Sequence, residues 1–168
     1  EVMKNEDKKG FYAGIDLGGT KILTVIEDEE RNVLAKTKIP TEATLGVGIV
    51  MDNIVKSLEI SCKEIDILPN GLSGIGIGVP GPVNHEKGLV YDCPNLSGWK
   101  NIEVRKLINE RWNVPVKVEN DARVAGLAET RLGAAKGFRH VFYITVSTGI
   151  GAAIIIDGKI YHGADGAA

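Results

Sequence analysis

Cysteine and histidine are scarce in this sequence, which limits the kinds of site it can form. Only two cysteines, Cys62 and Cys93, occur in 168 residues, too few for a disulfide framework. We therefore expect a reducing compartment, the cytoplasm. The three histidines, His85, His140 and His162, are scattered without metal-ligand spacing, so the sequence predicts no metal site built from histidine and cysteine.

Strong charge of one sign and long apolar runs are also missing. The net charge is −2, and no cluster of Lys and Arg with interleaved aromatic residues occurs, so we expect no nucleic-acid partner. No apolar run approaches the roughly 20 residues of a membrane span, and the charged start has no apolar segment of a secretion signal. The 43% hydrophobic and 25% charged composition is typical of a globular protein with one sizeable core or two modest lobes.

The segment from Asp16 to Lys21 reads Asp-Leu-Gly-Gly-Thr-Lys and lies between two apolar runs, a pattern that predicts two strands joined by a glycine turn. Gly18 and Gly19 let the backbone turn and keep side chains away from a bound phosphate. Thr20 and Lys21 add a hydroxyl and a cation, and Asp16 could hold a hydrated Mg²⁺. The spacing differs from that of a P-loop, so an anion would bind on a hairpin. A purely structural Gly-Gly hairpin is the alternative.

The first half of the chain predicts a meander, a helix and a further strand. We expect strands at 11–17, 21–27 and 33–39, then a helical period from Thr44. The apolar face of that helix consists of Val47, Val50, Met51, Ile54, Val55 and Leu58. A strand at 72–79 alternates isoleucine or valine with glycine.

A Pro-Gly-Pro sequence, Pro80 to Pro82, follows that strand. It predicts a stiff loop beyond the strand's carboxyl end, where open α/β sheets bind ligands, although a plain surface turn is the alternative. We expect a hairpin at 83–92 and then an ordered loop in which Trp99 is a packing anchor.

A further helix, strand and helix follow. Asn101 is a candidate N-cap for a helix through Trp112, and a strand is expected at 114–118. Glu119-Asn120-Asp121 leads into a helix rich in small residues that ends near Gly137. Asn120 or Asp121 could cap this helix or face a cleft, and both roles can hold together.

The last part of the chain repeats the opening plan. A strand at 141–146 leads into the turn Ser147-Thr148-Gly149-Ile150-Gly151, which is followed by a strand at 152–156 and an Asp-Gly turn. Two such turns facing each other across a cleft would hold a nucleotide's phosphates from both sides. The second turn has no Lys or Asp, which makes it the weaker phosphate signal.

Five motifs in this order resemble the ROK family (repressors, unannotated reading frames and sugar kinases), most of all its glucokinase branch. They are Asp16–Lys21, Gly78–Pro82, Pro94–Trp99, Glu119–Ala122 and Thr145–Gly151. The resemblance implies the actin-like ATPase fold, an α/β duplication of a ribonuclease H-like lobe. On this basis we expect one complete N-terminal lobe at 1–119, and at 120–168 the interlobe helix with the first strands of a truncated second lobe.

The resemblance also implies an activity and a set of residues. It implies transfer of a phosphoryl group from ATP, with Mg²⁺, to a hexose hydroxyl, giving glucose 6-phosphate from glucose as in glycolysis. The implied catalytic base is Asp121, and the sugar-binding residues are Gly81, Asn95, Asn120 and Asp121. The implied nucleotide-binding residues are Asp16, Gly18, Gly19, Thr20, Lys21, Ser147, Thr148, Gly149 and Gly151. The family further implies a homo-oligomer for the longer protein.

The end of the sequence departs from the family pattern. Residues 162–168 match the approach to the family's Gly-Glu-x-Gly-His segment, but its glutamate and histidine are not reached, nor is the cysteine-rich zinc motif that follows them. We therefore expect this chain to be an inactive part of a kinase whose remainder can hold zinc. Two alternatives stay open: a sugar-responsive regulator, which would need a helix-turn-helix, and an actin-like nucleotide-binding scaffold, which would hydrolyse ATP without sugar.

Overall fold

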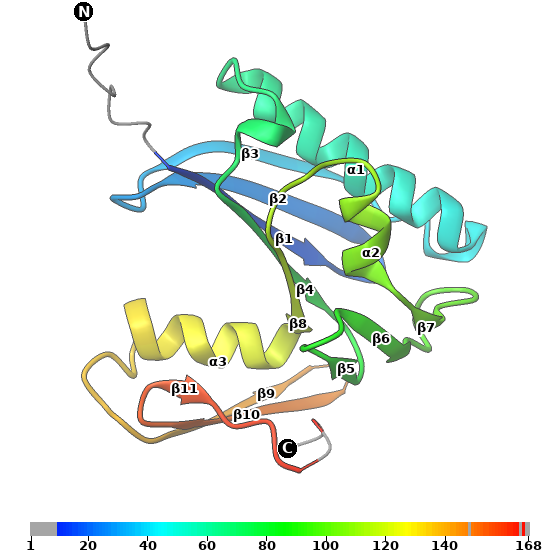
Figure 1. Cartoon of the computed structure of the whole chain (residues 1–168). Coiled ribbons are helices and arrows are strands. Elements are labelled where there is room, and N and C mark those ends of the chain that lie inside the picture. The colour runs from blue at the N-terminus through cyan, green and yellow to red at the C-terminus, as the bar shows by residue number, and fades with distance from the viewer. Residues whose placement is uncertain (1–9, 148, 165, 167–168) are drawn as a thin grey trace, which may run out of the picture.

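A mixed five-stranded sheet forms the centre of the molecule (Figure 1). The computed structural model describes residues 10–147, 149–164 and 166. The strands of this sheet are β1 (Phe11–Leu17), β2 (Lys21–Asp28), β3 (Val33–Pro40), β4 (Gly74–Val79) and β8 (Val116–Asn120), in the order β3-β2-β1-β4-β8. The first three strands form an antiparallel meander, and β4 and β8 run parallel to β1. The predicted opening meander is therefore confirmed.

The core lies between one face of this sheet and helix α1 (Val47–Glu64), which Figure 1 shows above the strands. The predicted apolar face of α1 is the buried one, and Ile54 and Leu58 are completely buried. Two hydroxyl pairs also join helix to strands: Thr24 with Ser57, and Ser61 with Thr37, each at 2.7 Å. Single-turn helices η1 (Ala43–Leu45) and η2 (Pro69–Gly71) precede and follow α1, so the helix begins three residues after the predicted start at Thr44.

A second small sheet and helix α2 (Val104–Asn109) extend the lobe beyond β4. The sheet contains β5 (Val83–Asn84), β6 (Leu89–Asp92) and β7 (Lys100–Ile102). The prediction for Asn101 was wrong. This residue lies in β7 with a φ of 55°, and helix α2 begins only at Val104, because the preceding residues pair with β6. Trp99 is 1% exposed, which confirms its role as a packing anchor.

Helix α3 (Asp121–Leu132) packs on a second meander, β9 (Val141–Val146), β10 (Ile150–Ile156) and β11 (Lys159–Ile160). The order β11-β10-β9 repeats the β3-β2-β1 arrangement of the first sheet, as the sequence predicts. Helix α3 approaches β10 so closely that position 126 requires glycine, because a Cβ on Gly126 would lie 2.7 Å from the Cβ of Ala153. The helix ends at Leu132, earlier than predicted.

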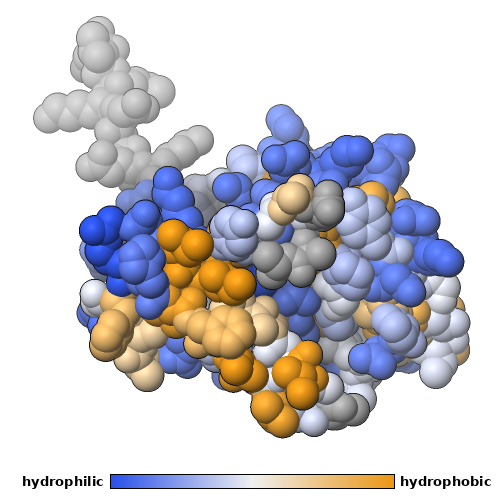
Figure 2. Space-filling model, turned by 90° about the horizontal axis from the view of Figure 1, so that it is seen from below, coloured by the Kyte–Doolittle hydropathy of each residue, from blue (hydrophilic) through white to orange (hydrophobic). Residues whose placement is uncertain are grey.

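The outer face of β9 and β10 is apolar and exposed. Four side chains on this face are each more than half exposed: Phe142, Ile144, Val146 and Ile150. Figure 2, which views the molecule from below, shows hydrophobic side chains grouped on this side. Among the described residues, no helix is both long and apolar enough to cross a membrane.

Candidate active site at the carboxyl ends of the central strands

The carboxyl ends of β1, β4 and β8 meet at one edge of the central sheet. Asp16 pairs with Gly78 across β1 and β4, and Gly78 pairs with Glu119 across β4 and β8. Parallel strands end side by side, so residues about 100 positions apart in the chain become neighbours. Three of the sequence motifs therefore converge on this edge.

Asn120 connects two of these motifs. Its Nδ2 donates to the carbonyl oxygen of Gly81 at 3.1 Å and to Oδ1 of Asp121 at 3.0 Å. Its Oδ1 accepts from the backbone N–H of Arg123 at 3.2 Å, which caps α3. The capping role is thus confirmed for Asn120, and the same side chain orients the predicted base.

Asp121 is the first residue of α3 and keeps an exposed carboxylate. Its Oδ1 accepts from the backbone N–H of Ala122 at 2.8 Å as well as from Asn120. No hydrogen bond within the described part of the chain engages Oδ2, so that oxygen is available to a bound hydroxyl.

The charge of Asp121 acts on the carboxylate of Asp16. Partial burial raises the pKa of Asp16, although the side chain retains exposed surface; the charge of Asp121 raises the pKa further, and Lys21 opposes the rise. Two carboxylates that repel each other form a donor set to which a hydrated Mg²⁺ fits, because a cation between them relieves the repulsion.

The first hairpin joins β1 to β2 as predicted. Its glycines are not needed for a positive φ; they leave room for a neighbouring loop. Neither Gly18 nor Gly19 has a positive φ. A Cβ on Gly19 would lie 3.5 Å from the Cβ of Asn95, so the loop containing Asn95 packs directly against the hairpin. Thr20 and Lys21 are both exposed.

Thr41 holds this hairpin, and sequence reasoning missed it. The Oγ1 of this fully buried residue donates to the carbonyl oxygen of Gly18 at 2.6 Å, and its N–H donates to that of Thr20 at 3.1 Å. The only sequence signal is a hydroxyl residue directly after a strand-ending proline.

Gly81 has a φ of 88°, and a Cβ at this position would overlap the carbonyl oxygen of Asp92. The Pro-Gly-Pro loop is therefore pressed against the end of β6, and Tyr91 N–H donates to the carbonyl oxygen of Pro82 at 3.0 Å. A loop fixed in this way is more than a plain surface turn.

The second glycine turn lies beside the start of α3. A Cβ on Gly151 would be 2.8 Å from that of Ala122, the residue after Asp121. The N–H of Ser147 donates to the carbonyl oxygen of Gly149 at 2.9 Å, which closes the turn, whereas Thr148 lies outside the described residues. Nothing lies within 4 Å of a Cβ built on Gly149.

An open hollow of about 1230 Å³ lies under the sheet face that α1 leaves uncovered. Its lining includes Asp16 and Asp121 but not Gly81, Asn95 or Asn120. Most of the lining is apolar surface of β1, β2, β4 and α3. The hollow therefore follows the uncovered sheet face and meets the candidate site only at one end.

Two histidines that are 77 positions apart in the sequence also meet at this edge. His85 stacks on His162, and His162 contacts Glu119. Their spacing in the sequence contains no sign of this cluster, because each histidine follows a strand of a different sheet.

The family model for ROK proteins matches residues 12–168. The chain belongs to the ROK family. A glucokinase of Streptomyces coelicolor is 37% identical over 159 residues, which are 95% of this chain and 48% of that protein. The xylose repressor of Bacillus subtilis is 33% identical over 95% of this chain and 41% of its own length. This ROK chain thus resembles both kinases and repressors.

The crystal structure of a ROK glucokinase from Streptomyces griseus, in complex with glucose and AMPPNP, superposes with a TM-score of 0.82 and 33% identity. The match covers 94% of this ROK chain and 48% of that chain. The fold is the actin-like ATPase fold of ROK sugar kinases, represented by an N-terminal lobe and the beginning of a second. The chain spans about half the length of the curated relatives it matches.

Proposed function

We propose that the protein containing this chain transfers the γ-phosphoryl group of ATP to a hexose hydroxyl, with glucose as the substrate. The observation that supports this most is the placement of Asp121: one carboxylate oxygen accepts from Asn120 and from a backbone N–H, and the other has no hydrogen bond to any residue that the structure describes. Glucokinases among the relatives support the same reaction class.

In this proposal Asp121 accepts the proton of the sugar hydroxyl while the hydroxyl oxygen attacks the γ-phosphorus and the bond to the ADP oxygen breaks. Gly81, Asn95 and Asn120 line the sugar pocket, and the rigid Gly81 loop orients the hydroxyl toward the base.

Asp16, Gly18, Gly19, Thr20 and Lys21 bind the phosphates from one side, and Ser147, Thr148, Gly149 and Gly151 bind them from the other. Mg²⁺, held in its hydration shell near Asp16, would neutralise phosphate charge as the reaction proceeds.

We further propose that residues 1–119 act as one lobe and 120–168 as the start of the other. The packing of α3 on β9 and β10 supports this boundary. A cytoplasmic location and a homo-oligomeric state stay predictions from the sequence.

The test is an assay of ADP release on the longer protein with a panel of hexoses, including glucose, N-acetylmannosamine, fructose and allose. We expect sugar-dependent turnover with glucose, and a loss of about a thousandfold or more for Asp121→Asn, which retains the hydrogen-bond acceptor but removes the base. A loss below about tenfold would remove Asp121 from the mechanism.

A sugar-responsive regulator is the second candidate, favoured by the xylose repressors among the relatives. Sugar binding measured by calorimetry without ADP release from any hexose would support the regulator. A rate of ATP hydrolysis that does not depend on sugar would instead support a nucleotide-binding scaffold.

A further inference from the structure

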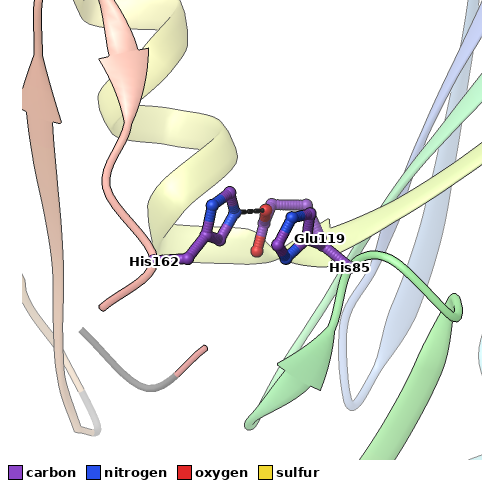
Figure 3. Close-up of side chains that lie close together, drawn as sticks. All are labelled: His85, Glu119 and His162. Atoms are coloured by element: carbon purple, nitrogen blue, oxygen red, sulfur yellow. Dashed lines mark hydrogen bonds and ion pairs between the residues drawn. The ribbon is translucent and has the colours of Figure 1, made fainter. Parts of the chain in front are cut away.

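Three side chains from separate parts of the chain converge beside the candidate active site (Figure 3). His85 follows β5, Glu119 lies in β8, and His162 follows β11. Nε2 of His162 is 2.6 Å from Oε2 of Glu119, and the two imidazole rings stack with centroids 3.6 Å apart. One potential ligand atom from each residue lies within 4.8 Å of the other two.

Neighbouring arginines hold two members of this cluster in place. Arg123 Nη1 lies 3.3 Å from Oε1 of Glu119, and its Nη2 donates to the carbonyl oxygen of Gly166 at 2.9 Å. The carboxylate therefore turns its other oxygen, Oε2, toward His162. Arg105 donates to the backbone carbonyl oxygen of His85 at 2.6 Å, which fixes the loop carrying that ring.

We propose that His85, Glu119 and His162 bind a divalent transition metal ion, with Zn²⁺ as the probe. Two imidazoles and one carboxylate form a donor set that Zn²⁺ and related metals take in proteins, with a further position left for water. All three side chains are only partly buried, so an ion can reach them from solvent. The site is separate from the Asp16 and Asp121 carboxylates, to which Mg²⁺ would be suited.

The cluster needs a small rearrangement to close around an ion. Ligand atoms on a tetrahedral zinc ion are about 3.3 Å apart. The three ligand atoms here lie within 4.8 Å of one another, so they must move somewhat closer together. The nitrogen lone pairs of two stacked rings lie in two parallel planes and cannot both point at one ion. One ring must therefore turn. The hydrogen bond between His162 and Glu119 is then replaced by two bonds to metal, and the proton between the two atoms moves to Nδ1 of His162 or, if Nδ1 already has one, to solvent. The positive charge of Arg123 weakens the site, whereas its hydrogen bond orients the carboxylate.

A bound ion would link elements from both parts of the fold. His162 belongs to the segment after β11, and Glu119 belongs to the central sheet. Glu119 also lies two residues before Asp121, so the ion would restrain the start of α3. This site is independent of the proposed kinase activity, and its test uses neither nucleotide nor sugar.

The test is titration of the purified, metal-free protein with Zn²⁺ by calorimetry and with Co²⁺ by visible absorption. We expect one ion per chain, a Co²⁺ spectrum with ligand-field bands, and weaker binding as the pH falls, because protons compete for the same atoms. His85→Ala, Glu119→Gln and His162→Gln should each reduce affinity by more than about tenfold. His162→Gln retains a side chain that can donate to Glu119, so a folding defect does not explain its loss.

His140→Ala is the matched control, because His140 is the remaining histidine and lies directly before β9, outside the cluster. It should leave affinity and stoichiometry unchanged. Circular dichroism on every variant establishes that the fold is retained. Equal losses for His140→Ala and His85→Ala, or no binding by the folded wild-type protein, would overturn the proposal.

Discussion

Asn120 donates a hydrogen bond to the carbonyl oxygen of Gly81 at 3.1 Å, so a side chain at the end of β8 fixes the loop that follows β4. The same residue caps α3 through Arg123 N–H and contacts Asp121. One side chain thus sets the relative positions of the loop, the helix and the candidate base.

Substitution of Asn120 should separate these roles. Asn120→Ser can still cap α3 but cannot reach Gly81, so we expect it to lower the free energy of unfolding by about 1 kcal/mol. Asn120→Ala loses both interactions and should lower it by about 2 kcal/mol. Urea denaturation measures both values. Equal losses for the two variants would show that the Gly81 hydrogen bond, and not the cap, is the main contribution.

Gly81 should not tolerate a side chain. Its φ is 88° and a Cβ would overlap the Asp92 carbonyl oxygen, so Gly81→Ala combines backbone strain with a clash. Gly46→Ala is the matched control, because Gly46 has a φ of 91° and nothing within 4 Å of a Cβ. We expect the control to lose about 1–2 kcal/mol of stability and Gly81→Ala about 1–3 kcal/mol more. Similar thermal unfolding midpoints for both would contradict the clash.

Thr41→Val should loosen the first hairpin. The substitution retains shape but removes the 2.6 Å hydrogen bond to Gly18, and we expect a loss of about 1–2 kcal/mol in stability together with a higher KM for ATP in the longer protein. Thr37→Val is the control, since it removes a buried hydroxyl pair with Ser61 away from the hairpin. It should lose similar stability without a change in KM. A shared change in KM would argue against a local role for Thr41.

Asp16 should make stability depend on pH. Its pKa in the folded protein lies above the usual 3.8, mainly through burial and then through Asp121, so the protonated form is favoured by folding. This favourable contribution is present at acidic pH and is lost as the pH rises through the folded-state pKa. Asp16→Asn should therefore be more stable than wild type at pH 7, by less than about 1 kcal/mol because solvent screens the exposed side, and the difference should vanish below about pH 4.

Denaturation at several pH values measures this difference. In an Asp121→Asn background the stabilisation by Asp16→Asn should shrink but persist, because burial is the larger cause. An unchanged difference would mean that the two carboxylates do not interact.

Local patterns in the sequence accounted for most of the fold. The alternating apolar residues of β1 and β2, the helical face of α1 and the repeated meander all have periods that identify the element and its buried side. The prediction failed at Asn101, where an N-cap residue precedes an apolar run. Pairing of residues 100–102 with β6 decided this segment, and that pairing depends on contacts outside the local sequence.

The candidate kinase residues stay predictions. The sequence indicates them because they lie in short motifs near strand ends, and parallel strands bring their ends together. The role of Thr41 could not be predicted. A single threonine has no motif around it, and its contact with Gly18 depends on where the end of β3 lies in the folded protein.

The sequence by itself determined the α/β pattern, the two glycine turns and the position of Asp121 at a strand-to-helix junction, because these depend on neighbours within a few residues. Only the tertiary structure decided that Asn120 reaches Gly81 and that His85, Glu119 and His162 share one place. Such contacts depend on which strands pair and how the loops between them pack, and a one-dimensional pattern contains no distance between segments far apart in the chain.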